Sequence, residues 1–443
     1  MALGKRAREE QGLWIATTEL PRSPGHPFYQ KLNQLLAEND FDRWLEKLCA
    51  PHYAANGRPS IPPGIYFRML LVGYFEGIQS QRGIAWRCSD SRSLAEFLGV
   101  AATEPTPDHS SLTRIRQRLP AEVSEAVFER VLGIAAAQKL LDGRTVAVDS
   151  TTLEANAAMK SIIRKDTGED YKAYLRRLAA EDGLDDLTDE ELRRYDKNRP
   201  DKKVSNAEWE SGTDPDSRIM KMKDGTTHLA YKAEHVVDVK TDLVLGVTVH
   251  PGNAPDTATL VDSVLEAQGH VRAAGSTAEI RDAIADKGYH AADTLALAAA
   301  LDLRTYIPEP GRHQRRSWQD KPAEQQAAVY ANRRRLRGTR SKKLQRLRSE
   351  LTERSFAHVC ETGGGRRCWL WGLADVTKRY VIMAAARNLG LIMRKLFGMG
   401  TPRGLQKGGG LFVWMHFATS WLSARLDRPC GAGCVWTPHS AAA

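Results

Sequence analysis

The sequence predicts two kinds of structure in succession, an all-helical N-terminal region and then a mixed α/β domain. From residue 27 to about 141 the apolar residues have helical spacing, whereas from Thr145 onward short β-branched runs alternate with helical patterns. Strands that alternate with helices are typical of a mixed sheet covered by helices. At 443 residues the chain is also longer than one compact core usually carries, which predicts more than one domain.

Turn and cap residues divide the N-terminal region into short helices. Pro63 begins an apolar helix that ends near Gly77, and Ser80 can cap the next one. A further helix, HSSLTRIRQRL, follows Asp108. Short helices joined by tight turns fit either a helix-turn-helix array or a plain bundle with a polar face. The first alternative would place DNA against three arginines of the last helix, Arg114, Arg116 and Arg118.

The second region begins with the strand pattern TVAVDS, which carries Asp149 to the end of a strand. A hairpin is expected at 231–250, then a helix at about 256–268 and a short strand, 283–285, that runs into Asp286. Two aspartates therefore leave strand ends of one predicted sheet. The other expected elements are surface helices near 171–178 and 189–195, a helix near 293–301, a strand at 305–307, and helices at about 344–359 and 376–397.

The net charge of +10 has a local origin. Between residues 304 and 348, fourteen Lys or Arg stand against three acids, a surplus of 11 that i,i+4 ion pairing cannot neutralise. Clustered cations of this kind favour a polyanionic partner, with nucleic acid as the default, because bound phosphates release counterions.

Membrane and secreted classes are disfavoured. The longest apolar stretch, 411–422, is too short for a bilayer, which takes about 20 residues. The start, MALGKRAREEQG, lacks the apolar core of a secretory signal. Six scattered cysteines without a CxxC pair fit reduced thiols, so we expect a cytoplasmic protein.

A trio of carboxylates gives the strongest chemical hypothesis. Asp149 and Asp286 at strand ends, with a glutamate on the helix after the basic segment, provide the hard oxygen ligands that two-metal phosphoryl transfer requires. Glu350 and Glu353 lie three residues apart on that helix, and either could reach the metals. Asp256 is another candidate for the second carboxylate, unless it caps the helix that follows it.

Long segments from about residue 10 to 400 resemble DDE-type insertion-sequence transposases of the IS4/IS5-like superfamily, most closely the IS1182 family. The segments that carry the resemblance are FYQKLNQLLAENDFDRWLE, GRPSIPPGIYFRMLLVGYFEGIQSQRGIAWRCSDS, TPDHSSLTRIRQRL, VAVDSTTLEANAAM, DPDSRIMKMKDGTTHLAYKAEHVVD, ADKGYH and TERSFAHVCETGG.

The resemblance implies an RNase H-like catalytic domain with a basic insertion at about 308–345. The family's three carboxylates fall on Asp149 in VDSTT, Asp286 in ADKGY and Glu353 in ERSFAH. They would hold two Mg²⁺ or Mn²⁺ ions, cut double-stranded DNA at terminal inverted repeats, and transfer the freed ends to target DNA. A homodimer in the DNA complex and a location at the bacterial nucleoid are also expected.

The expected organisation is a basic arm (1–25), a helical DNA-binding domain (26–140), the catalytic domain (141–400) and a divergent tail (401–443). A catalytically inactive DNA-binding relic and a sequence-independent nuclease are the alternative functions. Besides the three N-terminal arginines, the expected DNA contacts are Lys287, Arg333, Arg334, Arg335, Arg340, Lys342, Lys343, Arg346 and Arg354.

Overall fold

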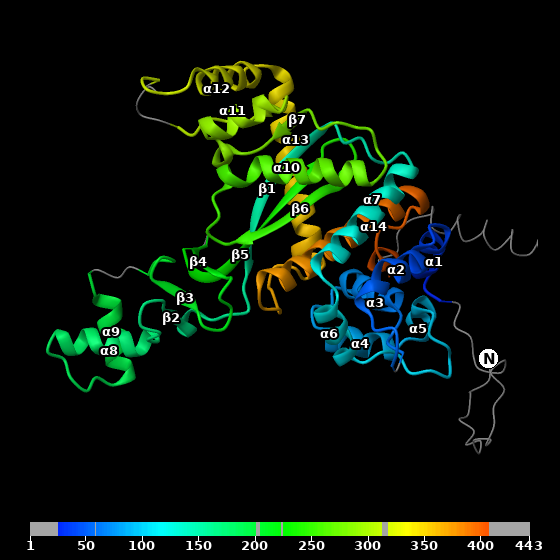
Figure 1. The fold of residues 1–443 in the computed structure, drawn as a ribbon, viewed down its shortest axis with the longest axis horizontal. Helices are drawn as coiled ribbons and strands as arrows, with labels where there is room; N and C mark the ends of the chain where they lie inside the picture. The colour runs from blue at the N-terminus through cyan, green and yellow to red at the C-terminus, as the bar shows by residue number, and fades with distance from the viewer. Residues whose placement is uncertain (1–24, 58, 201–203, 223–224, 312–317, 407–443) are drawn as a thin grey trace, which may run out of the picture.

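The computed structural model describes residues 25–57, 59–200, 204–222, 225–311 and 318–406 (Figure 1). Almost all of the expected N-terminal arm and most of the expected tail lie outside these ranges. Within them, helices alone precede the first strand and a mixed α/β region follows, as predicted. The helices before the first strand are α1 (Pro27–Glu38), α2 (Phe41–Cys49), a 3-10 turn (Ala50–His52), α3 (Pro63–Glu76), α4 (Gln81–Ser89), α5 (Arg92–Leu98), α6 (His109–Arg118) and α7 (Ala121–Ala137).

The predicted cap residues delimit these helices. Helix α3 ends at Gly77, which takes the left-handed conformation (φ 67°) that glycine adopts without strain. The Ser80 hydroxyl accepts a hydrogen bond from Gly83 N at 3.0 Å and caps α4. Asp108 likewise caps α6 by accepting from Ser110 N at 2.8 Å. Each cap satisfies an amide that the helix itself leaves unpaired.

Strand β1 is at the centre of the main sheet. It pairs antiparallel with β5 and parallel with β7, giving the order β4-β5-β1-β7-β8, with β6 also paired to β5. The predicted hairpin is the β5–β6 pair. The strands of this sheet are β1 (Thr145–Glu154), β4 (Arg218–Lys221), β5 (Thr227–Asp238), β6 (Val244–Pro251), β7 (Asp282–Ile284) and β8 (Arg304–Tyr306).

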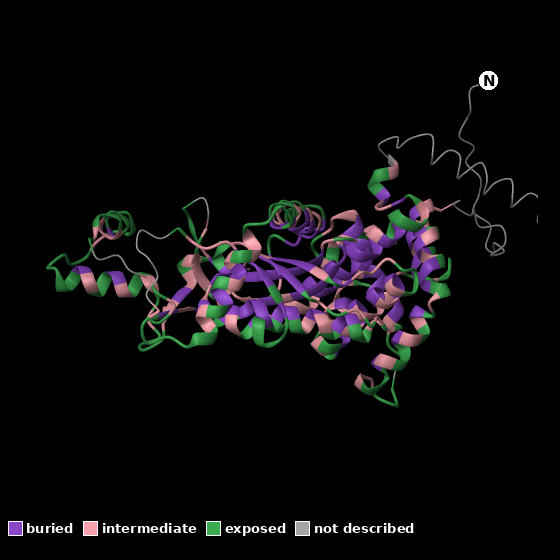
Figure 2. Ribbon diagram, turned by 90° about the horizontal axis from the view of Figure 1, so that it is seen from above, coloured by how far each residue is buried: buried purple, intermediate pink, exposed green. Residues whose placement is uncertain are grey.

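Helices cover both faces of this sheet, and alternation along the strands decides what each face contacts. Asp149 of β1 and its β5 partner His235 face α13, whereas the next pair, Ser150 and Glu234, faces α10. Figure 2 shows the buried residues concentrated in the strands and on the helix sides that face them. The helices of this region are α10 (Asp256–Ala273), α11 (Ala292–Ala300), α12 (Ala323–Leu336), α13 (Thr339–Phe356, continued by a π-helical turn, Ala357–Thr362), α14 (Leu373–Phe397) and α15 (Pro402–Gln406).

The structure contains a helix and several short strands that the sequence did not predict. Helix α12 and the first turns of α13 occupy the segment expected as a basic insertion, so α13 begins at Thr339 and not near Leu344. The two predicted surface helices are present as α8 (Tyr171–Glu181) and α9 (Asp189–Asn198). They project from the body on the small β2–β3 sheet (Ile162–Arg164 and Trp209–Ser211), which the sequence did not predict, as Figure 1 shows. They pack on each other through a small apolar cluster of their own, Leu175, Ala179 and Leu192.

One apolar core runs through the helical region and the α/β region. Helix α14 packs against α7 and α3 on one side and against β6 on the other. An ion pair between Arg116 of α6 and Asp375 of α14, at 3.0 Å, adds a polar link. No helix among the described residues is long and apolar enough to cross a membrane.

Asn388 gives a test of how α14 is attached to the sheet. Its buried side-chain amide accepts from Val244 N at 3.0 Å and donates to Val244 O at 2.7 Å. Replacing Asn388 with Ala leaves both backbone groups of Val244 unpaired, and we expect the free energy of unfolding to fall by about 3 kcal/mol. Urea denaturation measures the change. The exposed Gln117→Ala substitution on α6 is the control, and equal effects of the two changes would contradict the expectation.

Candidate active site

Asp149 lies near the middle of β1, and not at its end as predicted, because pairing with β5 continues to Glu154. Its carboxylate faces α13. Its Oδ1 accepts from Ser150 N at 2.9 Å, while Oδ2 accepts from the Thr352 hydroxyl at 3.1 Å and from Arg348 Nη1 at 2.6 Å. The side chain is 24% exposed, which leaves one open side. Burial raises the pKa of Asp149, an effect opposed by the Arg348 guanidinium and the Ser150 amide and reinforced by the negative charge of Asp286.

Asp286 reaches the same edge of the sheet through the parallel pairing of β7 with β1. Ala147 is in register with Ile284, and each aspartate lies two residues beyond that pair. β7 itself ends at Ile284, and the negative charge of Asp286 helps to raise the pKa of Asp149, so the two carboxylates lie within electrostatic range of each other. Asp286 Oδ1 accepts from Gly288 N at 2.8 Å, and this contact caps the short turn Lys287–Tyr289. The two aspartates are therefore brought near each other by the β1–β7 register, and their joint role stays a prediction.

Glu353 and Glu350 lie on α13 in different surroundings. Arg348 and Thr352 mark the side of α13 that faces Asp149; at 3.6 residues per turn, Glu353 is rotated roughly 120° from it and Glu350 roughly 180°. Glu353 is exposed, and its Oε1 accepts from the Ser349 hydroxyl at 2.9 Å. Glu350 pairs with Arg354, which also pairs with Asp242 at 3.3 Å. Of the two glutamates, Glu353 is the one nearer to the Asp149 side.

The carboxylate oxygens of the predicted site suit a hard divalent cation, but the side chains that carry them are not clustered around one point. Asp149 and Asp286 offer carboxylate oxygens at one sheet edge, the ligand type that Mg²⁺ prefers. In the described part of the chain, however, no three His, Cys, Asp or Glu side chains come close enough to hold a metal ion. Arg348 and Thr352 contact Asp149 in this arrangement, and Glu353 does not.

Asp256 does not cap α10, which corrects one of the two alternatives considered for it. The N-cap of α10 is Pro255, without a side-chain cap bond. Asp256 Oδ1 instead accepts from the Ser150 hydroxyl at 3.0 Å and from Lys232 Nζ at 2.9 Å. Its Oδ2 and Asp286 Oδ1 lie 3.1 Å and 3.0 Å from the point where a Cβ on Gly288 would be, so any side chain there would crowd both carboxylates.

A buried polar network supports this edge from the α10 side. Glu234 Oε2 accepts from the Tyr289 hydroxyl at 2.7 Å and from the Thr259 hydroxyl at 2.9 Å. Burial raises the pKa values of both Glu234 and Tyr289. Because the Tyr289 ring is buried, it is not available to a DNA strand and instead holds the turn after Asp286 in place.

The expected DNA-binding cations divide into two groups. Arg116 is 13% exposed and paired with Asp375, and Arg335 donates to Thr305 O at 2.9 Å, so the guanidinium groups of both are engaged in internal contacts. Arg333 pairs with Glu309, and Arg354 pairs with Glu350 and Asp242. The exposed cations are Arg114, Arg118, Lys287, Arg334, Arg340, Lys342, Lys343 and Arg346, of which Arg340 also pairs with Asp282 at 2.7 Å.

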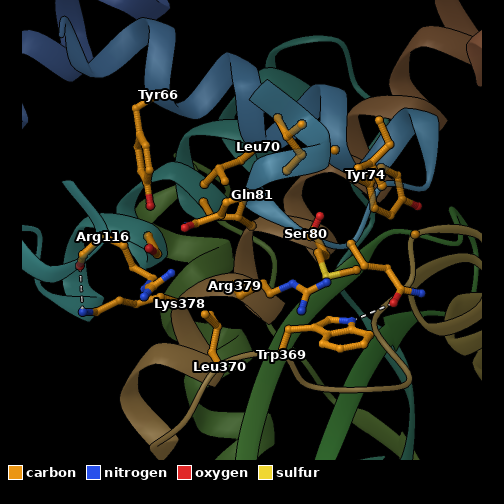
Figure 3. A pocket seen from close by; sticks show the side chains of 18 residues that line it. Tyr66, Leu70, Tyr74, Ser80, Gln81, Arg116, Trp369, Leu370, Lys378 and Arg379 are labelled. Atoms are coloured by element: carbon orange, nitrogen blue, oxygen red, sulfur yellow. Dashed lines mark hydrogen bonds between the residues drawn. The ribbon is translucent and has the colours of Figure 1, made fainter. Parts of the chain in front are cut away.

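A cavity of about 310 Å³ lies between the helical region and the α/β region, away from the three predicted carboxylates (Figure 3). Tyr66 and Tyr74 of α3 line one side of it, and Trp369 and Arg379 line the other. Trp369 Nε1 donates to Gln79 Oε1 at 2.7 Å across the boundary between the regions. None of Asp149, Asp286 and Glu353 lines this cavity, so we assign it no part in the acidic site.

Four side chains that contact Asp149 or Asp256 were not predicted from the sequence as site residues. They are Ser150, Lys232, Arg348, which lies at the end of the basic run, and Thr352. One signal was available, because Arg348 and Thr352 are four residues apart on a predicted helix and therefore share a face.

Comparison with known families identifies the protein class. The family model described as "Transposase domain (DUF772)" matches residues 18–118, and the one described as "Transposase DDE domain" matches residues 141–389, more than half of the chain. A search of curated proteins finds no match. The second match defines an enzyme of metal-dependent DNA cleavage and strand transfer. The chain belongs to the DDE transposases of insertion sequences and is of the IS1182-like type.

The Asp256–Lys232 pair yields a stability prediction. Lys232 is 5% exposed, and Asp256→Ala removes the ion-pair partner of its ammonium and leaves Ala254 O, at 2.6 Å, as an uncharged acceptor. We expect a loss of about 2 kcal/mol in the free energy of unfolding, less than for a fully buried pair because Asp256 is 32% exposed. Chemical denaturation measures it, with the exposed Asp262→Ala on the same helix as control. Adding Lys232→Met should recover most of the loss; a double variant as unstable as the single one would refute this explanation.

His235 yields a pH prediction. Its ring is buried against Phe356, its Nδ1 lies 2.9 Å from Ser355 Oγ, and burial lowers its pKa well below 6.5. Below about pH 6.5 the unfolded chain therefore binds a proton that the folded chain does not, so His235 makes stability fall as pH falls. His235→Gln should flatten the pH dependence of the unfolding free energy by up to about 1.4 kcal/mol per pH unit in this window. Parallel slopes for wild type and variant would contradict it.

Proposed function

We propose that Asp149, Asp286 and Glu353 are the catalytic carboxylates of this transposase and that they hold two Mg²⁺ or Mn²⁺ ions. The observation that carries the proposal is the parallel β1–β7 pair, which brings Asp149 and Asp286 to one sheet edge beneath α13. Glu353 is preferred to Glu350 because Glu350 is paired with Arg354 on the opposite side of α13.

We also propose that the catalytic domain, at about 141–400, has an RNase H-like fold. Support comes from the strand order, in which β6, β5 and β1 form an antiparallel run and β7 and β8 extend it in parallel. Residues 26–140 are the proposed helical DNA-binding domain.

The substrate we propose is double-stranded DNA at the terminal inverted repeats of the element, and then target DNA. Lys342, Lys343 and Arg346 lie exposed on the helix that carries Glu353, and Lys287 follows Asp286 directly. Phosphates bound by these cations would lie beside the carboxylates. Since two ends must be joined in one event, we propose a homodimer in the DNA complex, acting at the nucleoid.

In the proposed reaction the metal ions and the protein side chains have different roles. Divalent cations, when bound, would stabilise charge on the attacking and leaving oxygens. The chain's part is positioning: β1 and β7 fix two carboxylates, and the Glu234–Tyr289 contact holds the turn after Asp286. The exposed cations of α13 orient the phosphate backbone.

Excision of a marker bracketed by the gene's native flanking DNA, in Mg²⁺, tests the proposal. Asp149→Asn, Asp286→Asn and Glu353→Gln should each lower excision by about 100-fold or more, because each removes charge from the cation site. Glu350→Gln is the matched control and should retain activity.

Loss of excision with Glu350→Gln but not with Glu353→Gln would identify Glu350, and not Glu353, as the third catalytic carboxylate. Wild-type protein that binds the flanks without cutting them would instead identify a DNA-binding relic. Cutting without regard to the ends would identify a sequence-independent nuclease.

A further inference from the structure

Arg348 forms an ion pair with Asp149, the first of the proposed metal ligands. Its Nη1 lies 2.6 Å from Asp149 Oδ2, and the two side chains are 15% and 24% exposed. Thr352 donates to the same oxygen, while Oδ1 accepts from Ser150 N. Both carboxylate oxygens are therefore engaged by the protein itself.

The contact leaves Arg348 with unused donors. Its buried Nε has no hydrogen-bond partner in the described part of the chain, although a guanidinium has five donors and can bind an anion with two at once. Asp282 at the far end of β7 provides a contrast. It is 3% exposed and receives both Arg304 and Arg340, as a purely structural carboxylate would. Asp149, by comparison, has one arginine, and that arginine is incompletely paired.

We propose that Arg348 exchanges Asp149 for a DNA phosphate and thereby couples DNA binding to metal binding. The inference rests on the proposed metal site and names a positioning residue for it. The Arg348 guanidinium, 2.6 Å from Asp149 Oδ2, repels a metal cation that approaches the same carboxylate. Arg348 and the metal ion therefore compete for Asp149. DNA lying along the exposed cations of α13 offers phosphate oxygens to which Arg348 can bind by two parallel hydrogen bonds. Linkage then requires each ligand to tighten the other.

Mn²⁺ affinity, measured by calorimetry on the full chain, tests this coupling with and without a short duplex of unrelated sequence. In wild type the duplex should raise Mn²⁺ affinity about tenfold, within the usual range of coupling between sites. Arg348→Gln should bind Mn²⁺ about tenfold more tightly than wild type without DNA, and the duplex should then add little. Arg348→Lys keeps the charge and should restore part of the coupling.

Arg346→Gln is the matched control, because Arg346 is exposed on the same helix and has no contact with Asp149. It should weaken DNA binding while leaving the Mn²⁺ affinity measured without DNA unchanged. Unchanged or weaker Mn²⁺ binding by a folded Arg348→Gln variant would overturn the inference. So would a wild-type Mn²⁺ affinity that does not respond to DNA, a result that needs no variant to fold.

A further variant separates failure of this inference from failure of the proposed site. If Asp149→Asn abolishes Mn²⁺ binding while Arg348→Gln leaves it as in wild type, the proposed metal site is supported and the proposed exchange by Arg348 is refuted. If Mn²⁺ binding does not depend on Asp149, both fall together.

Discussion

The parallel pairing of β7 with β1 is the constraint on which the acidic site depends. Only three residues of each strand pair, yet this register sets Asp149 and Asp286 at equal offsets from Ala147 and Ile284. A slip of one residue would direct Asp286 to the opposite face of the sheet. The register is supported by the ends of β7, where Arg304 and Arg340 bind Asp282 and where Asp286 caps the following turn.

Helix α13 is the second determinant, because its rotation about its own axis decides which side chains meet Asp149. Two contacts fix that rotation. Gln345 donates to Tyr306 O at 2.6 Å near the start of the helix, and Ser355 is bonded to His235 near its end. With both ends fixed, Arg348 and Thr352 face Asp149 and Glu353 stands to one side. The same helix thus carries both the carboxylate that we propose as a metal ligand, Glu353, and the arginine that we propose competes with the metal, Arg348.

Local signals in the sequence were sufficient to predict most of the helices, the main strands and the placement of two aspartates on or just after neighbouring strands. Cap residues such as Ser80 and Asp108, and the polar residue that ends a β-branched run at Asp149, act within a few positions of the chain. The pairing of Asp256 with Lys232 joins residues 24 apart, and that of Arg348 with Asp149 joins residues 199 apart. Contacts of this kind depend on how helices cross the sheet, which spacing alone does not determine. Helix α12 was missed because its arginines and alanines lack an apolar face, and only its docking on β8 and α11 selects the helix.

The shared core has a consequence for the order in which the chain can mature. Phe28 and Phe75 of the first helices are buried, and Gly390 of α14 comes close enough to the Phe75 ring that an added methyl group would lie 3.4 Å from it. Helix α14 covers the N-terminal helices, and it is translated some 300 residues after them. Until α14 has been translated, those helices present an uncovered apolar face, so the helical region and the α/β region become native together and late in synthesis.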